Sequence, residues 1–118
     1  MKIKLSPVRM NAELSAEVQG DIIILNGESL DLSPLPDGGV LPAAAILNPW
    51  VLGDVERIDG DIHLTLILPH GQNAPYETRF PAAYEVPMTV TDGLVPLPAY
   101  DTPVSVVEDQ PEQEVLLA

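Results

Sequence analysis

The dipeptide Asp59-Gly60, set between two stretches of alternating apolar and polar residues, constrains the fold of this chain more than any other feature. Asp-Gly favours a two-residue turn in which both residues take positive φ, and the alternation favours antiparallel strands on either side. Pairing across this turn places Glu56 opposite His63 and gathers one apolar set on one face: Val51, Val55, Ile62, Leu64, Leu66 and Leu68. The pattern therefore predicts a β-hairpin with one buried face.

Three short strands are predicted ahead of this hairpin. Residues 13–19 alternate, residues 22–25 are apolar on both faces, and residues 28–32 follow the turn pair Asn26-Gly27. Gly20-Asp21 fits a tight turn with glycine first. The resulting register aligns three apolar side chains across the three strands, namely Val18, Ile23 and Leu30. We therefore expect residues 22–25 to form a central strand.

A third hairpin is predicted around Asp92-Gly93, between residues 86–90 and 95–99. Its prolines favour an outer edge position, because proline has no N–H to donate to a neighbouring strand. Residues 33–49 and 70–87 read as connectors rich in proline, with one helical turn after Pro42. Pro69 is expected to end the strand that precedes the second connector.

At 118 residues, the chain has the length of one domain. We expect an all-β fold of about seven or eight short strands, a small sandwich or open barrel built from consecutive hairpins with Pro-rich connectors. This β domain should span residues 1–100, and residues 101–118 should form an acidic, flexible C-terminal tail. The final residues, 115–118, are apolar again and fit either a short docking peptide or a frayed end.

The formal net charge is −13, from 18 acidic and 5 basic residues. Such a surface repels phosphates and anionic lipids, so binding to nucleic acid or to a membrane is not expected. The charge fits a solvated surface or, as an alternative function, an acidic decoy that mimics nucleic acid and inhibits a basic host protein. No cysteine is present, which excludes disulfides and thiolate metal sites. Residues 1–7 alternate instead of forming a signal peptide, and we expect a cytoplasmic protein or a component of an assembled particle.

No catalytic, cofactor-binding or metal-binding constellation stands out. Asp54, Glu56, Asp59 and Asp61 lack the closing glutamate of a calcium loop. His63 opposite Glu56 fits an acid–base pair or a cross-strand charge pair, and no nucleophile accompanies it. We therefore expect a protein that is not an enzyme.

Two histidines are present, and the second, His70, follows a predicted strand end, where functional loops often lie. A small hydrolase or metal-dependent enzyme using His70 and Glu77 is accordingly a further alternative. Arg57 and Arg79 are expected to tether neighbouring carboxylates. Trp50 fits a core or strand-end anchor, or a platform for a ligand. The candidate contact residues for a partner are Trp50, His70, Tyr76, Arg79, Phe80, Leu116 and Leu117.

Residues 1–7, 49–60 and 64–71 resemble small acidic proteins encoded in phages and prophages, close to tail genes. The resemblance covers roughly residues 1 to 100 and carries no functional residue over. It implies a phage-encoded, non-enzymatic protein–protein interaction module, such as a tail accessory or assembly protein. Its partners would be other phage structural or assembly proteins, and its location the bacterial host cytoplasm or the virion. Exposed sheet edges are also compatible with a homo-oligomer.

Overall fold

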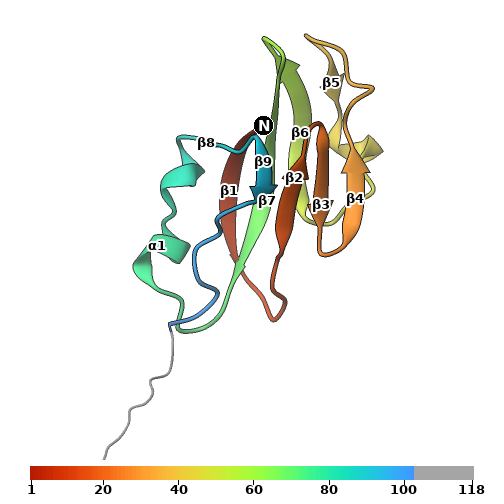
Figure 1. The fold of residues 1–118 in the computed structure, drawn as a ribbon. Helices are drawn as coiled ribbons and strands as arrows, with labels where there is room; N and C mark the ends of the chain where they lie inside the picture. The colour runs from red at the N-terminus through yellow and green to blue at the C-terminus, as the bar shows by residue number, and fades with distance from the viewer. Residues whose placement is uncertain (103–118) are drawn as a thin grey trace, which may run out of the picture.

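Two β-sheets pack face to face in the computed structural model of this protein, which describes residues 1–102 (Figure 1). Sheet A contains β1 (Lys2–Arg9), β5 (Val40–Leu41), β6 (Val51–Ile58), β7 (Asp61–His70) and β8 (Met88–Thr89), in the spatial order β5-β6-β7-β1-β8. Sheet B contains β2 (Ala16–Gln19), β3 (Ile22–Leu25), β4 (Glu28–Asp31) and β9 (Asp92–Leu94), in the order β4-β3-β2-β9. The expected all-β, sandwich-like architecture is confirmed.

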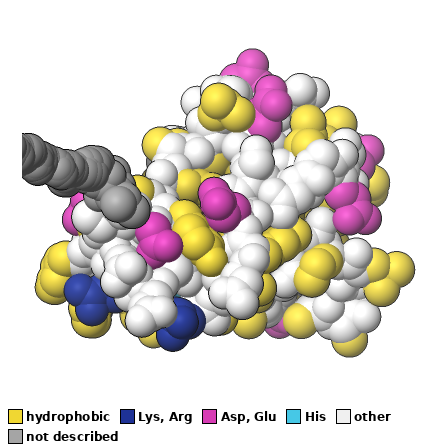
Figure 2. Space-filling model, turned by 90° about the horizontal axis from the view of Figure 1, so that it is seen from below, with side chains coloured by type: hydrophobic (Ala, Val, Ile, Leu, Met, Phe, Trp, Pro, Cys, Tyr) yellow, Lys and Arg dark blue, Asp and Glu magenta, His cyan; other side chains and the backbone are white. Residues whose placement is uncertain are grey.

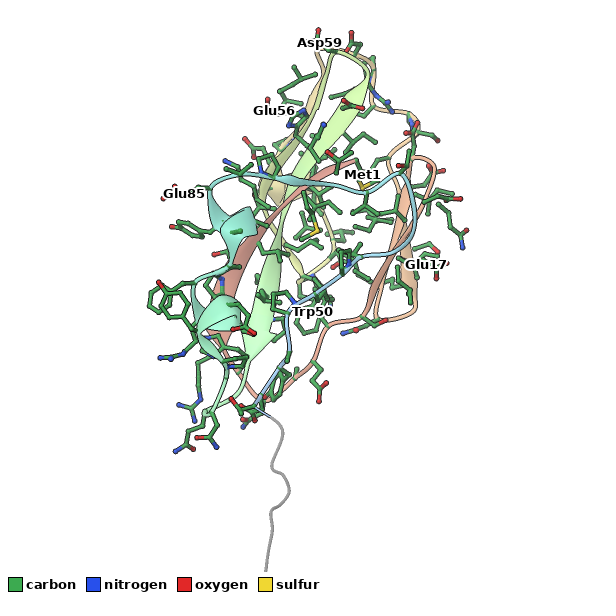
Figure 3. All side chains as sticks on the ribbon, turned by 60° about the vertical axis from the view of Figure 1, so that its left-hand side comes forward. Met1, Glu17, Trp50, Glu56, Asp59 and Glu85 are labelled. Atoms are coloured by element: carbon green, nitrogen blue, oxygen red, sulfur yellow. The ribbon has the colours of Figure 1, made fainter. Side chains whose placement is uncertain are left out.

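One hydrophobic core fills the space between the sheets. Alternate residues of each strand face inward, so β1 contributes Ile3 and Leu5, while β2 contributes Ala16 and Val18. Every second residue of β7 from Ile62 to Leu68 is buried in the same core. Figure 3 shows Met1 and Trp50 among the side chains that lie between the sheets.

Two of the three expected hairpins are present. Asn26 and Gly27 have φ of 50° and 84°, and Asp59 and Gly60 have φ of 51° and 86°, as a two-residue turn with positive φ requires. Glu56 pairs with His63 as predicted. In sheet B, Ile23 pairs with both Val18 and Leu30, and β3 lies between two neighbours. The prediction of a central strand over residues 22–25 is confirmed.

The hairpin at Asp59-Gly60 departs from its predicted register beyond Glu56. The pairing shifts between Leu52 and Glu56, so that Leu52 pairs with Thr65 where a regular ladder would pair it with Ile67. Gly53 lies in this irregular stretch with φ of 77°, a conformation that glycine adopts readily. The shift is two residues, so the buried face is preserved.

The prediction of a third hairpin, around Asp92-Gly93, is wrong. β8 pairs with β1 in sheet A, whereas β9 pairs with β2 in sheet B. Of the two turn residues only Gly93 has positive φ, at 100°, so the backbone does not make the paired turn. The segment therefore crosses from one sheet to the other.

β1 and β7 form a parallel pair, which the model of consecutive hairpins did not include. Pro69 was also expected to end its strand, yet β7 continues to His70. The carbonyl of His70 accepts a hydrogen bond from Met10, on the β1 side, so Pro69 is directed to the opposite side. The β6 pairing has already ended there, at Leu66, and the missing N–H of Pro69 leaves no partner unsatisfied.

Three short helical turns lie in the two connectors, and each starts directly after a proline. These are η1 (Ala43–Ala45) after Pro42, α1 (Tyr76–Arg79) after Pro75 and η2 (Ala82–Tyr84) after Pro81. The turn after Pro42 was predicted and is confirmed, whereas the turns in residues 70–87 were not foreseen. Proline suits the start of a helical turn because the first N–H groups there have no helical partner.

The described chain ends where residues 100–102 pair with the loop after β7. Gly71 donates to the carbonyl of Tyr100, and Thr102 donates to the carbonyl of Asn73, both at 2.8 Å. The Asp101 carboxylate accepts from the backbone N–H of Asn73 at 2.9 Å. The remainder of the predicted acidic tail, including Leu116 and Leu117, lies outside the described residues.

Candidate protein-interaction surface

Exposed aromatic side chains gather on one short segment of this aromatic-poor protein. The chain has five aromatic residues, and three of them, Tyr76, Phe80 and Tyr84, lie within nine positions of one another. Their exposed fractions are 68%, 61% and 57%, and that of the nearby Val86 is 72%. We call these four residues, together with Pro7 of β1, the aromatic surface.

Local contacts fix the rings of α1. The centroids of Tyr76 and Phe80 are 4.9 Å apart, and the backbone N–H of Phe80 donates to the carbonyl of Tyr76. The guanidinium of Arg79 lies 5.9 Å from the Phe80 ring centroid, within range of a cation–π contact. Arg79 also donates through Nε to the carbonyl of Ala74 at 3.1 Å. The exposed rings are therefore held by their own segment before any partner binds.

The opposite side of the same segment is anchored in the protein. Thr78 is fully buried, and its hydroxyl donates to the carbonyl of Ala99 at 2.6 Å. Pro81 and Ala83 are buried as well, and Ala83 belongs to the main core. Buried and exposed residues thus alternate along one ordered segment, which presents the aromatic rings outward from a fixed base.

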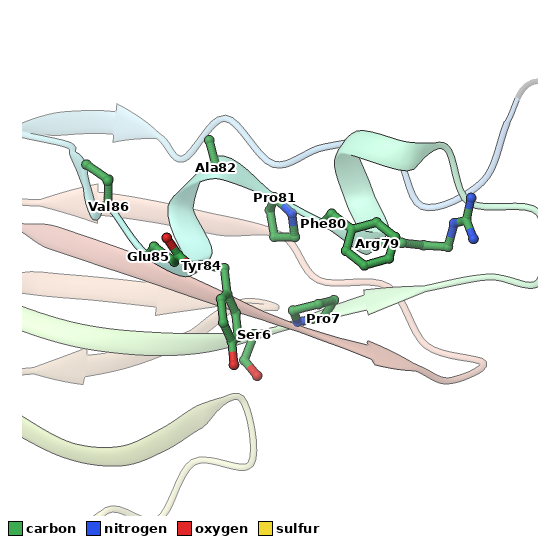
Figure 4. Close-up of a pocket in the computed structure, with 9 residues that line it drawn as sticks. All are labelled: Ser6, Pro7, Arg79, Phe80, Pro81, Ala82, Tyr84, Glu85 and Val86. Carbon is green, nitrogen blue, oxygen red and sulfur yellow. The ribbon is translucent and has the colours of Figure 1, made fainter.

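A pocket of about 680 Å³ opens between this segment and the outer side of β1 (Figure 4). It is lined by Ser6, Pro7, Arg79, Phe80, Pro81, Ala82, Tyr84, Glu85 and Val86. In Figure 4 the Tyr84 ring lies across β1 with its hydroxyl on the same side as Ser6, and the Phe80 ring lies beside α1. A few polar groups at the edge of an apolar hollow are typical of sites that recognise a specific ligand or partner.

Four of the five basic residues lie on β1 or α1, namely Lys2, Lys4, Arg9 and Arg79. Of these, Arg79 lines the pocket, together with the carboxylate of Glu85. The fifth, Arg57, is occupied elsewhere in an ion pair with Asp21 at 3.0 Å, the one ion pair among residues 1–102. On the face seen from below, Figure 2 shows two basic side chains close to hydrophobic ones. The prediction of a carboxylate tether is thus confirmed for Arg57, while Arg79 binds a carbonyl instead.

The predicted pair of Glu56 and His63 lies on the outer face of sheet A. Glu56 and His63 border a smaller hollow of about 220 Å³ together with Lys2, Lys4 and Asp54. Over residues 1–102, no group of three or more histidine or carboxylate side chains is arranged to hold a metal ion. His70 lies at the end of β7, where its Nδ1 is 3.0 Å from the Gly71 carbonyl oxygen, and Glu77 is exposed on α1.

The structure brings three of the predicted contact residues together, namely Tyr76, Arg79 and Phe80. Trp50 lies apart from them, half-buried against the core, and its carbonyl accepts from Ile67 at 2.9 Å. Tyr84 and Val86 were not singled out from the sequence, nor were the β1 residues that complete the pocket. Their signal in the sequence was the four-residue spacing of Tyr76, Phe80 and Tyr84, which repeats at roughly one helical turn.

Comparison of this chain with protein families, curated proteins and solved structures found no match. No helix among the described residues is long and apolar enough to cross a membrane. We therefore infer the function from the fold and from the geometry of this surface.

Proposed function

We propose that this protein is a non-enzymatic protein–protein interaction module and that the aromatic surface is its docking site. The observation that carries the proposal is the exposure of Tyr76, Phe80 and Tyr84, each more than half accessible, on one anchored segment. Aromatic residues are enriched in protein interfaces because they bury a large area at little cost in side-chain entropy.

The surroundings of the rings support the same proposal. The pocket beside them gives a partner side chain a place to insert, and Arg79 and Tyr84 provide hydrogen-bond donors at its edge. A hydrophobic centre with polar groups at the rim is the usual anatomy of an interface. Because the segment is anchored through Thr78, little ordering is needed on binding.

The biological context that we propose follows from the sequence resemblance to phage and prophage proteins. In this context the protein is a tail accessory or assembly protein, and its partner is another phage structural or assembly protein. It would act in the bacterial host cytoplasm, or within the virion if it remains bound after assembly.

Affinity purification of the full chain from phage-producing cells tests the proposal. The protein should retain a component of the virion or of an assembly intermediate, identified by mass spectrometry. The double variant Phe80→Ser/Tyr84→Ser should lose that component, with binding to the purified partner weakened about 30-fold or more, because truncating a central aromatic costs about 2 kcal/mol or more.

A matched control is available on other parts of the molecule. Val40 and Leu94 are also exposed apolar residues, with exposed fractions of 51% and 74%. The variant Val40→Ser/Leu94→Ser should retain the partner. Equal retention by both double variants would show that the partner binds elsewhere, and failure to retain any virion or assembly component would overturn the proposed function.

A further inference from the structure

We propose that Asn26 is a deamidation site and that its hydrogen bonds to residues 13–15 control how often it reacts. Asn26-Gly27 is the one Asn-Gly pair in the sequence. Glycine after asparagine leaves the backbone nitrogen accessible to the asparagine side chain, because no Cβ shields it. The other asparagines precede alanine or proline: Asn11, Asn48 and Asn73. The inference concerns sheet B and goes beyond the proposed docking of a partner.

Three hydrogen bonds join Asn26 to the chain segment that leads into β2. Its backbone N–H donates to the carbonyl of Ser15 at 2.8 Å. Its side-chain Oδ1 accepts from the backbone N–H of Ser15 at 2.7 Å, and its Nδ2 donates to the carbonyl of Glu13 at 3.0 Å. The carboxamide thus serves as both donor and acceptor and extends the β2–β3 pairing past Ala16 and Leu25. We call these three hydrogen bonds the Asn26 clamp.

The turn that carries Asn26 is open to water, although the side chain is held. Asn26 and Gly27 are both exposed, and a Cβ built on Gly27 would meet no atom within 4 Å. The turn joins β3 to β4 at one end of sheet B (Figure 1). Water, which deamidation consumes, therefore reaches the site, and the clamp is the restraint that the structure places on the carboxamide.

Deamidation would join the Asn26 side chain to the next residue of the chain. The Gly27 nitrogen attacks Cγ of Asn26, the new N–Cγ bond forms, the Cγ–Nδ2 bond breaks, and ammonia leaves with the proton of the Gly27 nitrogen. Water then opens the cyclic imide at either carbonyl and gives aspartate or isoaspartate. As Cγ becomes tetrahedral and Nδ2 departs, the carboxamide atoms leave their places in the clamp. The reaction therefore proceeds from the fraction of molecules in which the clamp is open.

Either product prevents the clamp from closing again. Aspartate has no side-chain donor for the carbonyl of Glu13 and places a carboxylate against it instead. Isoaspartate carries the main chain through its side-chain carbon atoms, so the turn with positive φ at Asn26 and Gly27 is lost. Deamidation would therefore detach residues 13–15, which lie in the connection between β1 and β2, from the turn of sheet B.

The rate of deamidation in the full chain tests this inference. The protein is incubated at mildly alkaline pH, and conversion at Asn26 is followed by peptide mapping with mass spectrometry. A synthetic peptide of residues 20–32, which lacks the partners of the clamp, gives the reference rate. Deamidation should be at least about tenfold slower in the folded protein, because opening the clamp costs free energy. Asn11, Asn48 and Asn73 should remain unconverted over the same period.

Hydrogen exchange provides a second, independent rate. The N–H of Ser15 bonds to the Asn26 side chain, so its exchange with solvent reports the opening of the clamp. The factors by which exchange at Ser15 and deamidation at Asn26 are slowed should agree within about threefold. An unprotected Ser15 amide would overturn the inference. So would deamidation at the peptide rate, deamidation much slower than exchange at Ser15 allows, or earlier conversion at another asparagine.

The converted protein tests the consequence, and Asn11→Asp is its matched control. Asn11 is exposed in the same connection, so this substitution adds an equal charge without touching the clamp. Ser15 should lose its protection in the converted protein, separated by ion exchange, and keep it in Asn11→Asp, while Ile23 stays protected in both. Protection of Ser15 that survives conversion would overturn the role of the Asn26 amide. Partner capture by the aromatic surface is a separate measurement, so the proposed function and this inference fail independently.

Discussion

Arg57 connects parts of the chain that are far apart in sequence. Its guanidinium donates to the carbonyls of Leu32, Leu35 and Gly60 and to the carboxylate of Asp21, at distances of 2.6 to 3.3 Å. Asp21 belongs to the turn between β2 and β3, so this side chain ties the hairpin of sheet A to sheet B. Asp21 is close to half exposed, and the ion pair alone should contribute little. The Leu32 carbonyl also accepts from the N–H of Leu35, so the partly buried carbonyl of Leu35 is the one that depends most on Arg57 for a donor.

Replacing Arg57 with methionine keeps most of the side-chain volume and removes all of these donors. We expect the free energy of unfolding to fall by about 1–3 kcal/mol, because the carbonyl of Leu35 is left without its donor in a partly buried position. Urea denaturation measures this change. Arg9→Met removes an exposed arginine and should change stability by about 0.5 kcal/mol or less, so similar losses in the two variants would contradict the role assigned to Arg57.

At the end of β4, Asp31 accepts hydrogen bonds from both the hydroxyl and the backbone N–H of Ser33, at 2.7 and 3.0 Å. These bonds, the hydroxyl bond foremost, lower the pKa of Asp31 below its ordinary value of 3.8. Because the folded pKa is the lower one, the stabilising contribution is present above the unfolded pKa and is lost as the pH falls through the folded pKa.

Ser33→Ala removes the hydroxyl bond, and we expect the pKa of Asp31 to rise toward 3.8. An NMR titration of the Asp31 carboxyl carbon measures this rise. Any difference in stability between the two proteins should disappear at a pH below the pKa of Asp31 in the original protein. An unchanged titration curve would show that the Ser33 hydroxyl does not hold the carboxylate.

At the scale of elements, the hairpins show what local sequence determines. Asn26-Gly27 and Asp59-Gly60 were predicted correctly because turn chemistry and side-chain alternation agree there. Asp92-Gly93 carries the same dipeptide, but its flanks contain Pro87, Pro96 and Pro98, which cannot donate to a ladder. There, pairing with two different sheets replaces the hairpin.

Features that depend on pairing between residues far apart in the sequence could not be predicted from local patterns. No turn signal connects β1 to β7, so their parallel alignment could not be inferred from local patterns. Gly53 inside a strand was a usable signal for the irregular register. For the candidate surface, the sequence indicated Tyr76, Arg79 and Phe80, whereas the contribution of β1 to the pocket emerges only from the packing of α1 and η2 against that strand.

The loop after β7 and residues 100–102 meet so closely that a side chain at Gly71 would have to displace that of Asp101. A Cβ at this position would overlap the Asp101 carboxylate. We expect Gly71→Ala to lower stability by about 0.5–1.5 kcal/mol, because the Asp101 side chain can move away but then loses its hydrogen bond to Asn73. Thermal or urea unfolding provides the measurement.

A double-mutant cycle provides the control for this steric explanation. Asp101→Gly removes the carboxylate, so the cost of Gly71→Ala should be much smaller in the Asp101→Gly background. If the two losses simply add, the cost of alanine comes from the backbone of Gly71 and not from contact with Asp101.

At the scale of the whole molecule, residues 88–95 connect the two sheets directly. The backbone N–H of Val90 donates to the carbonyl of Met1, directly before β1 of sheet A, and that of Val95 donates to the carbonyl of Ala16 in sheet B, both at 2.9 Å. Both valines belong to the common core. The short stretch between them therefore couples the sheets through hydrogen bonds as well as through packing.

This coupling predicts that the sheets unfold together. In native-state hydrogen exchange, the most protected amides of sheet A, such as Leu66, and of sheet B, such as Ile23, should report the same free energy of opening, within about 0.5 kcal/mol. Val90 and Val95 should follow them. A clearly lower opening free energy in sheet B would show instead that it is an independent unit.

The parallel pairing of β1 with β7 also affects the order in which the fold is completed during synthesis. Lys2 pairs with His63, so β1 gains this neighbour only after the roughly 60 residues between them have been synthesised. β2, β3 and β4 are joined by tight turns and can pair as soon as they emerge. The nascent chain should therefore build most of sheet B first, while Ile3 and Leu5 stay without a strand partner until β7 is translated. The strand that borders the candidate docking site would thus be made before most of sheet B and gain its strand partner after it.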